Sequence, residues 1–523
     1  MRSFVTVQIA VVLFGLCWRG ATAQRQVACP SDATIEGYVN LTEIILDMEE
    51  EQTRIVAGGT ANDSYTFTLC PNTDFDAENN TFIPLLNNST FVCPAAAGAD
   101  VPNCNFVGGA EQVVIDASST DAITIETLNF EGIGFTGFNG TSIQARGPLE
   151  LDAIFTNCDW TAFTSLLVFN VSRDDDAPVM RVTIRDSTMS NGFGSAAVSN
   201  VNGRVVVEET TFTEMDFGTI VSSEMRGFTE MTRVTVSECS LLNCVFANEG
   251  SFTEVIASSF INNPNISIAF VGDGNGTQLE LRRIRVSNNQ NIPAAWSAVA
   301  VDNGAVALVA SSSFNNNANF DVGVGATVGA FATIVNSEFI GNNGLAPDSV
   351  SALAFALNMS RLVVETTVFQ DNTAYTSSVF GIFGGSVSLE GACIIGGSSI
   401  APVFQGQDVA LTIDETTNFA TNHQSSVCNT DDSMRTFLED DGATCFQPGG
   451  SCTGTCRAFG SATECAALLT PAPTTVAPTS VPSVSPTSSP TPGVTGATSP
   501  PTAAPNMTPT TPEPTSSPTA GPT

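Results

Sequence analysis

The 523-residue sequence contains no lysine and a single histidine, His423. Schiff-base catalysis and P-loop nucleotide binding both depend on a lysine side chain, so the sequence excludes both. His423 lies in Thr421-Asn422-His423-Gln424, and no G-x-S-x-G turn occurs that could supply the nucleophile of a Ser–His–Asp triad. The sequence therefore predicts no catalytic residue.

Positive charge is scarce as well. All 17 basic residues are arginine, against 52 Asp and Glu, and the formal net charge is −35. Removal of a signal peptide with two arginines would bring the mature charge to 15 − 52 = −37. Because this charge repels the phosphates of nucleic acids and the head groups of anionic lipids, we expect neither as a partner. It suits either divalent cations, with Ca²⁺ as the candidate cofactor, or a solvated acidic surface without a specific partner.

Long apolar runs are also lacking, and none reaches the ~18 residues that a membrane-spanning helix needs. At the N-terminus, Met1-Arg2-Ser3 is followed by a short apolar run from Phe4 to Leu16 and by Ala21-Thr22-Ala23. A basic start, a short apolar segment and an A-x-A site predict a signal peptide over 1–23. We expect a secreted protein that acts outside the cell, at the cell surface or in the cell wall.

Of the 14 cysteines, 13 remain after the predicted cleavage because Cys17 lies in the signal peptide. In an exported protein, cysteines clustered near the two ends favour disulfides over zinc sites. The candidates are Cys29, Cys70, Cys93, Cys104, Cys428, Cys445, Cys452, Cys456 and Cys465. The odd number leaves at least one thiol free or paired between chains. Eleven N-x-S/T sequons predict N-glycosylation at Asn40, Asn62, Asn79, Asn87, Asn88, Asn139, Asn170, Asn265, Asn275, Asn358 and Asn506.

The chain repeats a unit of the form V-x-I-x-x-S-x-F-x-x-N. Clear copies are Val205–Phe212, Glu254–Asn263, Ala307–Asn317, Thr333–Asn343 and Leu362–Asn372. The large apolar position, taken as an anchor, falls at Phe106, Phe130, Phe155, Met189, Phe212, Cys239, Phe260, Val286, Phe314, Phe339, Phe369, Ile394 and Phe419. Alternating β-branched residues within each unit predict three short strands per repeat.

Three strands per repeat predict an all-β, right-handed parallel β-helix of about 13 coils, stacked ~4.8 Å apart. We expect the anchor phenylalanines to form the core, and the asparagines that end each unit to bond the next coil. The expected parts are the signal peptide 1–23, an N-terminal Cys-containing cap with the first coils over 24–105, the parallel β-helix 106–425, a Cys-rich C-terminal cap 426–466 and a disordered stalk 467–523. The Pro/Thr/Ser-rich composition of the stalk predicts an extended, O-glycosylated segment.

Through these coils, residues 106–425 resemble the pectin-lyase-like superfamily of right-handed parallel β-helices. The whole layout is similar to secreted algal β-helix proteins with Pro/Thr/Ser-rich tails. The resemblance implies the fold, and members of the superfamily mostly cut, de-esterify or epimerise acidic polysaccharides. The Gly-His-Gly of the polygalacturonase type is absent. The Gln-Asp-Thr of the methylesterase type has a counterpart only in Gln370-Asp371-Asn372-Thr373, where the repeat places a polar turn.

A candidate Ca²⁺ site follows from counting three residues back from successive anchors, which gives Asp152, Asp186 and Glu209. Carboxylates stacked ~5 Å apart repel one another unless a cation or an arginine lies between them. Oxygen ligands suit Ca²⁺, whereas the adjacent Arg185 could neutralise the column instead. The longest anchor spacing holds an acidic loop, Asp174-Asp175-Asp176, which is either a binding loop or a solvated turn.

Three functions fit these features. The first is a secreted, acidic and non-catalytic glycoprotein of the cell surface or extracellular matrix, whose β-helix binds polysaccharide or divalent cations. The alternative, implied by the resemblance, is a Ca²⁺-dependent polysaccharide lyase or C5-epimerase acting on uronate polymers. A self-assembling matrix component joined by an unpaired cysteine is a third, which requires only the odd number of thiols.

Overall fold

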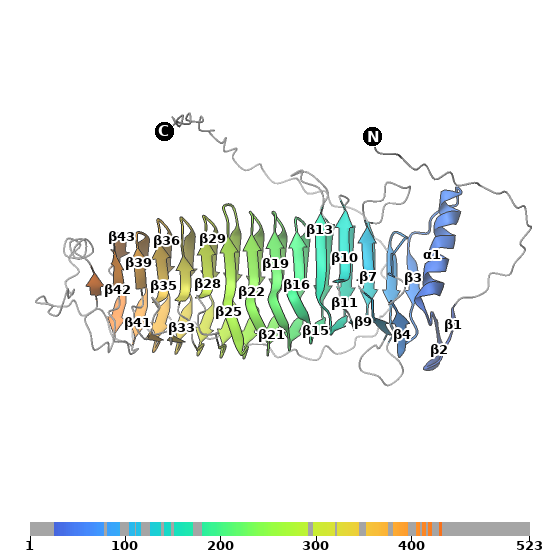
Figure 1. Ribbon diagram of the computed structural model, residues 1–523, viewed down its shortest axis with the longest axis horizontal. Helices are drawn as coiled ribbons and strands as arrows, with labels where there is room; N and C mark the ends of the chain where they lie inside the picture. Colours follow the sequence, from blue (N-terminus) through green and yellow to red (C-terminus); the bar gives the residue numbers. More distant parts are fainter. Residues whose placement is uncertain are drawn as a thin grey trace, which may run out of the picture. The chain divides into compact units, whose positions relative to one another are not determined.

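The computed structural model describes residues between 26 and 430, with gaps. The gaps are 78–80, 95–103, 110, 117–125, 138–140, 148–150, 171–179, 291–296, 319–321, 345–351, 375–379, 396–403, 408–409, 415–416 and 421–427. Nearly all described residues belong to a β-solenoid with three parallel sheets (Figure 1). The predicted fold class is confirmed. No helix within these ranges is long and apolar enough to cross a membrane.

Each coil contributes one strand to each of three sheets, called sheet 1, sheet 2 and sheet 3. Sheet 1 has 13 strands: β7 (Glu111–Asp116), β10 (Thr141–Gly147), β13 (Ser165–Asn170), β16 (Phe193–Val201), β19 (Asp216–Glu224), β22 (Ser240–Asn248), β25 (Asn265–Asp273), β28 (Ser297–Asp302), β31 (Val322–Ala326), β35 (Ala352–Leu357), β39 (Phe380–Phe383), β42 (Phe404–Gln407) and β45 (Cys428–Thr430).

Sheet 2 has 14 strands: β3 (Tyr65–Thr68), β5 (Ser89–Val92), β8 (Thr127–Glu131), β11 (Leu151–Thr156), β14 (Met180–Arg185), β17 (Arg204–Glu208), β20 (Phe228–Thr232), β23 (Phe252–Ile256), β26 (Gln278–Arg282), β29 (Val306–Ala310), β32 (Phe331–Val335), β36 (Arg361–Glu365), β40 (Ser386–Glu390) and β43 (Ala410–Ile413).

Sheet 3 also has 14 strands: β4 (Thr73–Asp76), β6 (Cys104–Val107), β9 (Ile133–Thr136), β12 (Asp159–Thr161), β15 (Thr188–Ser190), β18 (Thr211–Thr213), β21 (Thr235–Ser237), β24 (Ser259–Ile261), β27 (Arg285–Ser287), β30 (Ser313–Asn315), β33 (Glu338–Ile340), β37 (Val368–Gln370), β41 (Cys393–Ile395) and β44 (Asn418–Ala420). Outside the three sheets, β34 (Asn343–Gly344) pairs with β38 (Thr373–Ala374).

Inside the solenoid, equivalent residues of successive coils stack on one another. The rings of Phe314, Phe339 and Phe369 are stacked with centroid distances of 4.6 and 5.1 Å. Buried asparagines form a ladder in which the Nδ2 of Asn263 donates to Asn289 Oδ1 at 2.9 Å. Both the phenylalanine core and the bonding of asparagines between coils are confirmed. Gln370 and Asp371 end a strand and form a corner, which confirms the polar turn predicted there.

The register corrects three of the predicted anchors. Phe130 and Phe155 lie on sheet 2, and the residues of sheet 3 that stack in the anchor column are Phe135 and Trp160. In a later coil, the residue that pairs with Phe212 is Val236 and not the predicted anchor Cys239. At Phe130 and Phe155 the anchor rule was wrong because large residues face inward from both sheets, whereas Cys239 lies beyond the end of β21. Counting large apolar residues along the sequence cannot tell two adjacent inward-facing strands apart.

The N-terminal end of the solenoid is covered by helix α1 (Leu41–Val56) and a hairpin of β1 (Val27–Cys29) and β2 (Asp32–Gly37) (Figure 1). Asn40 caps the helix by accepting a hydrogen bond from the N–H of Glu43 at 3.0 Å. The helix buries its apolar face, formed by Leu41, Ile44 and Met48, in the core. It therefore shields the open end of the first coils, which would otherwise expose apolar core and an unpaired strand edge.

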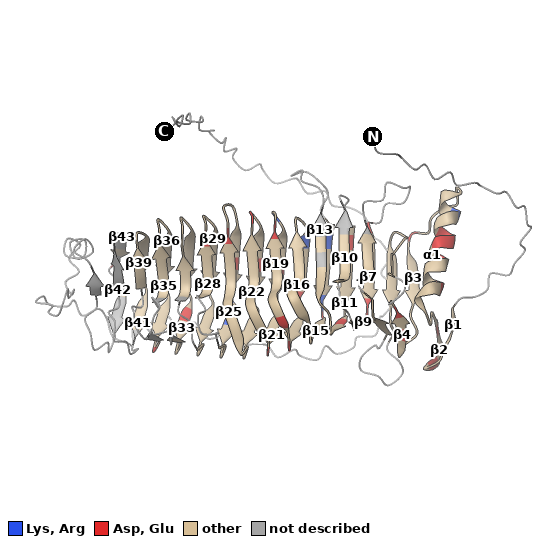
Figure 2. Ribbon diagram, in the orientation of Figure 1, with Lys and Arg blue, Asp and Glu red and all other residues tan. Residues whose placement is uncertain are grey.

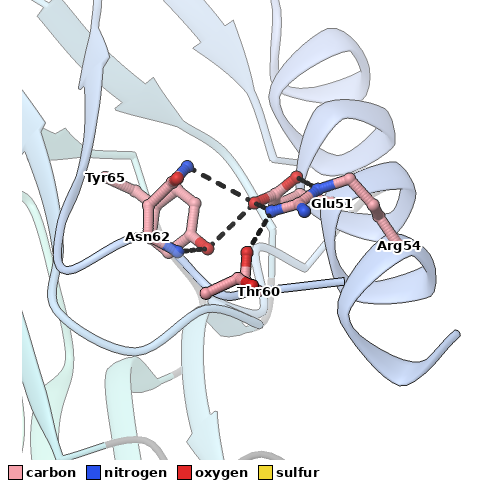
Figure 3. Close-up of polar contacts among 5 residues, drawn as sticks. All are labelled: Glu51, Arg54, Thr60, Asn62 and Tyr65. Carbon is pink, nitrogen blue, oxygen red and sulfur yellow. Dashed lines mark hydrogen bonds and ion pairs between the residues drawn. The ribbon is translucent and has the colours of Figure 1, made fainter. Parts of the chain in front are cut away.

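A polar cluster holds the C-terminal half of α1 to the chain that follows it (Figure 3). Arg54 donates to both carboxylate oxygens of Glu51 and to the carbonyl oxygen of Thr60. Glu51 also accepts a hydrogen bond of 2.9 Å from the hydroxyl of Tyr65, at the start of β3. Arg54 lowers the pKa of Glu51, and burial raises the pKa of Tyr65. The cluster therefore fixes the helix against the first strand of sheet 2.

Two disulfides join residues of this N-terminal region, Cys29–Cys70 and Cys93–Cys104. All four were among the predicted disulfide cysteines. Cys393, which no sequence pattern singled out, is also disulfide-bonded. Within the described ranges Cys158, Cys239 and Cys244 are free and buried in the core.

Candidate functional site

The predicted acidic column lies at a corner of the solenoid, between sheet 2 and sheet 3. A single residue in the left-handed region makes this corner in each coil, with φ of 51° at Asp186, 47° at Glu209 and 55° at Arg233. The N–H groups of Asp186 and Glu209 donate to carbonyl oxygens of the next coil at 3.1 and 2.9 Å. These three side chains therefore stand in one column on successive coils, ~4.8 Å apart.

Arg233 neutralises this column. Its Nε donates to Glu209 Oε1 at 2.6 Å, and its Nη2 lies 2.6 Å from the same oxygen. The hydrogen bond from Arg233 holds the pKa of Glu209 below its usual value. Burial, followed by a hydrogen bond with Glu209, raises the pKa of Asp186. An arginine therefore takes the place that a cation would take beside these carboxyl groups. Arg185, the arginine suggested by the sequence, donates to Thr156 Oγ1 instead.

Asp152 does not belong to this column. It lies within β11, in register with Arg181 of β14. The corner residue of its coil is Asn157, three residues before Trp160, so the predicted stacking of Asp152 with Asp186 and Glu209 was wrong. Over the ranges that the structure describes, no three His, Cys, Asp or Glu side chains are placed to hold a metal ion.

Several predicted residues lie outside the described ranges. They are Asp174, Asp175, Asp176, His423, Cys445, Cys452, Cys456, Cys465, Asn79, Asn139 and Asn506. Asn170 and Cys428 belong to described strands, but the side chains of these two residues are not described. The remaining sequons are accessible: Asn87 is half-buried, and Asn40, Asn62, Asn88, Asn265, Asn275 and Asn358 are exposed. Glycosylation of these residues stays a prediction.

A groove of about 650 Å³ crosses the outer face of sheet 1 over β16, β19 and β22. These are among the longest strands of the solenoid, with nine residues each. Its polar lining is Ser195, Ser199, Asp216, Thr219, Ser222, Glu224 and Asn243. Leu242 and Phe246 contribute apolar surface, and Leu242 is 57% exposed. The groove combines hydrogen-bonding and apolar groups, as ligand sites do.

Glycines allow the strands to approach closely along one side of the groove. A Cβ atom at Gly218 would lie 2.6 Å from the carbonyl oxygen of Ser195, and one at Gly194 would lie 2.7 Å from that of Thr164. Gly194 also has a φ of +147°, which side chains rarely allow. Small residues on β16 and β19 therefore face the larger Leu242 and Phe246 on β22, and this contrast in size hollows the surface.

Two polar groups of the groove are held in place by a hydrogen bond, and a third has no partner. Ser222 donates to Glu224 Oε1 at 2.7 Å, which fixes both side chains. Thr219 is 5% exposed, and its Oγ1 has no hydrogen-bond partner. Two carboxylates, Asp216 and Glu224, lie in the lining, and no arginine does. Acidic residues elsewhere on the described chain lie mostly at strand ends and on α1 (Figure 2).

Comparison with known proteins shows similarity at the level of structure alone. No family model and no curated protein matches the sequence. The structure is similar to tailspike protein 3 of bacteriophage CBA120 (10% identity, TM-score 0.30), covering 74% of this chain and 59% of the tailspike. It is similar to the A-module of the Azotobacter vinelandii mannuronan C-5 epimerase AlgE4 (11%, 0.29), covering 75% of this chain and 98% of the module. A third is PfbA, a surface adhesin of Streptococcus pneumoniae (9%, 0.24), covering 73% of this chain and 89% of the adhesin.

The class of this chain, a parallel β-helix, follows from its own strand topology. The chain spans about three fifths of the tailspike. With TM-scores of 0.30 or less, these similarities add nothing about the site. The function of the groove therefore has to be inferred from the residues that line it.

Proposed function

We propose that the protein is a secreted, acidic glycoprotein of the cell surface or extracellular matrix that binds a neutral polysaccharide in the groove of sheet 1. The observation that carries the proposal is the composition of the groove, where hydroxyl, amide and carboxylate groups surround Leu242 and Phe246. Sugar hydroxyls can donate to Glu224 and Asp216 and can both donate to and accept from Ser199 and Asn243. The apolar faces of sugar rings fit against Phe246 and Leu242.

The charge of the groove favours a neutral ligand over a uronate polymer. Asp216 and Glu224 would repel the carboxylates of a polyuronate, and the lining offers no arginine to compensate them. The net charge of −35 adds to this repulsion at long range. A Ca²⁺-dependent lyase or epimerase would need cations to bridge enzyme and polymer, and the carboxylate column is already paired with Arg233. No observation on the described residues favours that alternative.

Several features support the extracellular setting of the proposal. The sequence begins with a signal-peptide pattern, and Cys29–Cys70 and Cys93–Cys104 form disulfides, which persist in oxidising compartments. The exposed sequons are accessible to the glycosylation machinery. The Pro/Thr/Ser-rich composition of 467–523 is also typical of O-glycosylated segments of extracellular proteins.

The proposal is tested with the mature chain on an array of neutral and acidic glycans, followed by calorimetric titration of the best ligand. Phe246→Ala should weaken binding at least ~10-fold through lost apolar contact, and Ser222→Tyr should abolish it by filling the groove. Ser388 provides a matched control, because it lies on sheet 2 and donates to Glu390 in the same Ser-x-Glu arrangement. Ser388→Tyr should bind as the unmodified protein does. Selective binding of polyuronates, or binding that Ser222→Tyr leaves intact, would refute the proposal.

A further inference from the structure

The outer face of sheet 3 carries a regular array of hydroxyl groups. On β15, β18 and β21 the outward-facing pairs are Thr188 with Ser190, Thr211 with Thr213, and Thr235 with Ser237. Each strand has the form Thr-x-Thr or Thr-x-Ser, with the middle residue (Met189, Phe212 or Val236) buried. Ser259 of β24 and Thr161 of β12 extend the two columns by one strand in either direction. We call these residues the hydroxyl array.

Strict register makes the array two-dimensional. Thr188 pairs with Thr211, and Thr211 pairs with Thr235, without a bulge. The second column runs in the same way through Ser190, Thr213 and Ser237. Hydroxyls therefore repeat about every 4.8 Å along the solenoid, and about every 6.7 Å across each strand. Because threonine is stiff at χ1, its hydroxyl and methyl groups hold one orientation relative to the sheet.

The centre of the array has hydroxyls available to an outside ligand. Over the described part of the chain, the side-chain hydroxyls of Thr211, Thr213, Thr235, Ser237 and Ser259 make no hydrogen bond with another residue. These side chains are half-buried, and their oxygens are not among the buried polar atoms that lack a partner. The hydroxyls therefore contact solvent at fixed, repeated positions, where they can order water.

The array is neutral, and charged residues bound its first column. That column ends at Asp159 on β12 and at Arg285 on β27, and the second column ends on β24, where Ile261 follows Ser237. On the following strand, β27, Ser287 is only 2% exposed, so its hydroxyl is not accessible from this face. A charged mineral surface would require carboxylates or arginines within the array. The array offers only groups that donate and accept equally, which suits a neutral lattice whose surface molecules do both.

We propose that the hydroxyl array binds ice. The two repeats are close to the repeats between oxygen atoms on a prism face of hexagonal ice, so water ordered by the hydroxyls can merge with that lattice. The methyl groups of the threonines lie between the hydroxyls and favour a cage of ordered water around them. A crystalline polysaccharide is the other neutral lattice to consider. It exposes apolar ring faces that aromatic side chains would meet, and no outward position from β15 to β24 is aromatic.

The proposal is tested with the full mature chain by partition into slowly grown ice and by measurement of thermal hysteresis. Thr213→Tyr, at the centre of the array, should reduce partition at least ~10-fold and remove hysteresis because it breaks the flat surface. Thr211→Val keeps the shape and methyl groups and should cause a partial loss. Thr333→Tyr, at an outward position of sheet 2, is the control and should behave as the unmodified protein. Circular dichroism and thermal unfolding confirm that each variant is folded.

Exclusion of the unmodified protein from ice would overturn the proposal, as would full partition of Thr213→Tyr. Sedimentation with microcrystalline cellulose or chitin that Thr213→Tyr abolishes, without partition into ice, would assign the array to a crystalline polysaccharide instead. The groove and the array lie on different sheets, so Ser222→Tyr should leave partition into ice unchanged. Failure of either proposal can therefore be recognised independently of the other.

Discussion

The side chain of Asn289 links three coils of the solenoid through its two neighbours in the asparagine ladder. Its Nδ2 donates to Asn317 Oδ1 at 3.0 Å and to the carbonyl oxygen of Phe260 at 2.9 Å. Its Oδ1 accepts from both the backbone N–H and the Nδ2 of Asn263. All three asparagines are buried. Each amide therefore satisfies polar groups that no water can reach, and the ladder holds the corner between sheet 3 and sheet 1.

Replacement of Asn289 should destabilise the solenoid strongly. Asn289→Leu leaves the backbone N–H of Asn263 without an acceptor, and the Nδ2 of Asn263 keeps only its hydrogen bond to the carbonyl oxygen of Val236. A buried unsatisfied donor costs about 1–3 kcal/mol. We expect a loss of about 2–5 kcal/mol, measured from urea unfolding and from faster hydrogen exchange in the flanking coils. Asn129→Leu is the control, because Asn129 makes a single long contact of 3.4 Å on the outer face of sheet 2. An equal effect of both changes would contradict the role given to the ladder.

The pairing of Arg233 with Glu209 predicts a small dependence of stability on pH. Because Arg233 lowers the pKa of Glu209 in the folded protein, the pair stabilises the fold above the ordinary pKa of 4.5. That contribution is lost as the pH falls through the lowered value. Arg233→Gln should therefore reduce stability at pH 7 by less than about 1 kcal/mol, since the pair is exposed.

The difference between the unmodified protein and Arg233→Gln should disappear below the lowered pKa of Glu209. The difference is measured by thermal unfolding between pH 2 and pH 7. This range extends well below the ordinary pKa of a carboxyl group, which is about 4. Arg226→Gln, at an exposed turn, serves as a control for the loss of one positive charge. A constant difference across this range would show that Arg233 acts without regard to the charge of Glu209.

Three buried thiols should be inert in the folded protein. Burial raises the pKa of Cys158 to about 12 and that of Cys239 to about 11, and it also raises the pKa of Cys244. Reaction with a thiol reagent requires the thiolate and access to it. At pH 8 we expect no labelling of the peptides that carry these residues, followed by complete labelling in denaturant, as read by mass spectrometry. Rapid labelling in the folded state would show that the core opens there.

The two N-terminal disulfides should differ in their effect on the cap. By chain-entropy arguments, closing the 41-residue separation of Cys29–Cys70 is worth about 4 kcal/mol, and the 11-residue separation of Cys93–Cys104 about 3 kcal/mol. Cys29→Ser/Cys70→Ser should therefore increase hydrogen exchange in α1 more than Cys93→Ser/Cys104→Ser does. The reverse order would show that local packing, rather than loop closure, sets the stability of the cap.

The fold could be predicted from the sequence because its columns repeat. Phenylalanines and asparagines such as Phe314 and Asn317 recur at the coil period, and each has one structural role that its chemistry explains. The register was harder to predict from the sequence, because Phe155 and Trp160 both face inward from neighbouring strands of one coil. That ambiguity misplaced Asp152, whereas Asp186 and Glu209 lie in one column on successive coils as predicted.

The groove could not be predicted from the sequence. The position of Ser222 is occupied by Phe246, Val271 and Ala300 in the next three coils, so no repeated motif marks it. The groove arises from the size difference between residues of neighbouring coils, such as Ser222 and Phe246, and from the close approach that Gly218 allows. Such a surface depends on which residues become neighbours across coils, and this depends on the register.

Hydroxyl-radical footprinting of the mature protein, with and without its best neutral glycan, shows whether a polysaccharide binds in the groove of sheet 1. Bound glycan should protect Phe246 and Leu242 from oxidation by at least ~3-fold, because both line the groove. Met359, which is 85% exposed at a turn after β35, serves as the internal reference and should react equally in both samples. Protection confined to Phe246 and Leu242 would place the ligand in the groove of sheet 1. Unchanged oxidation of both residues at saturating glycan would contradict the account.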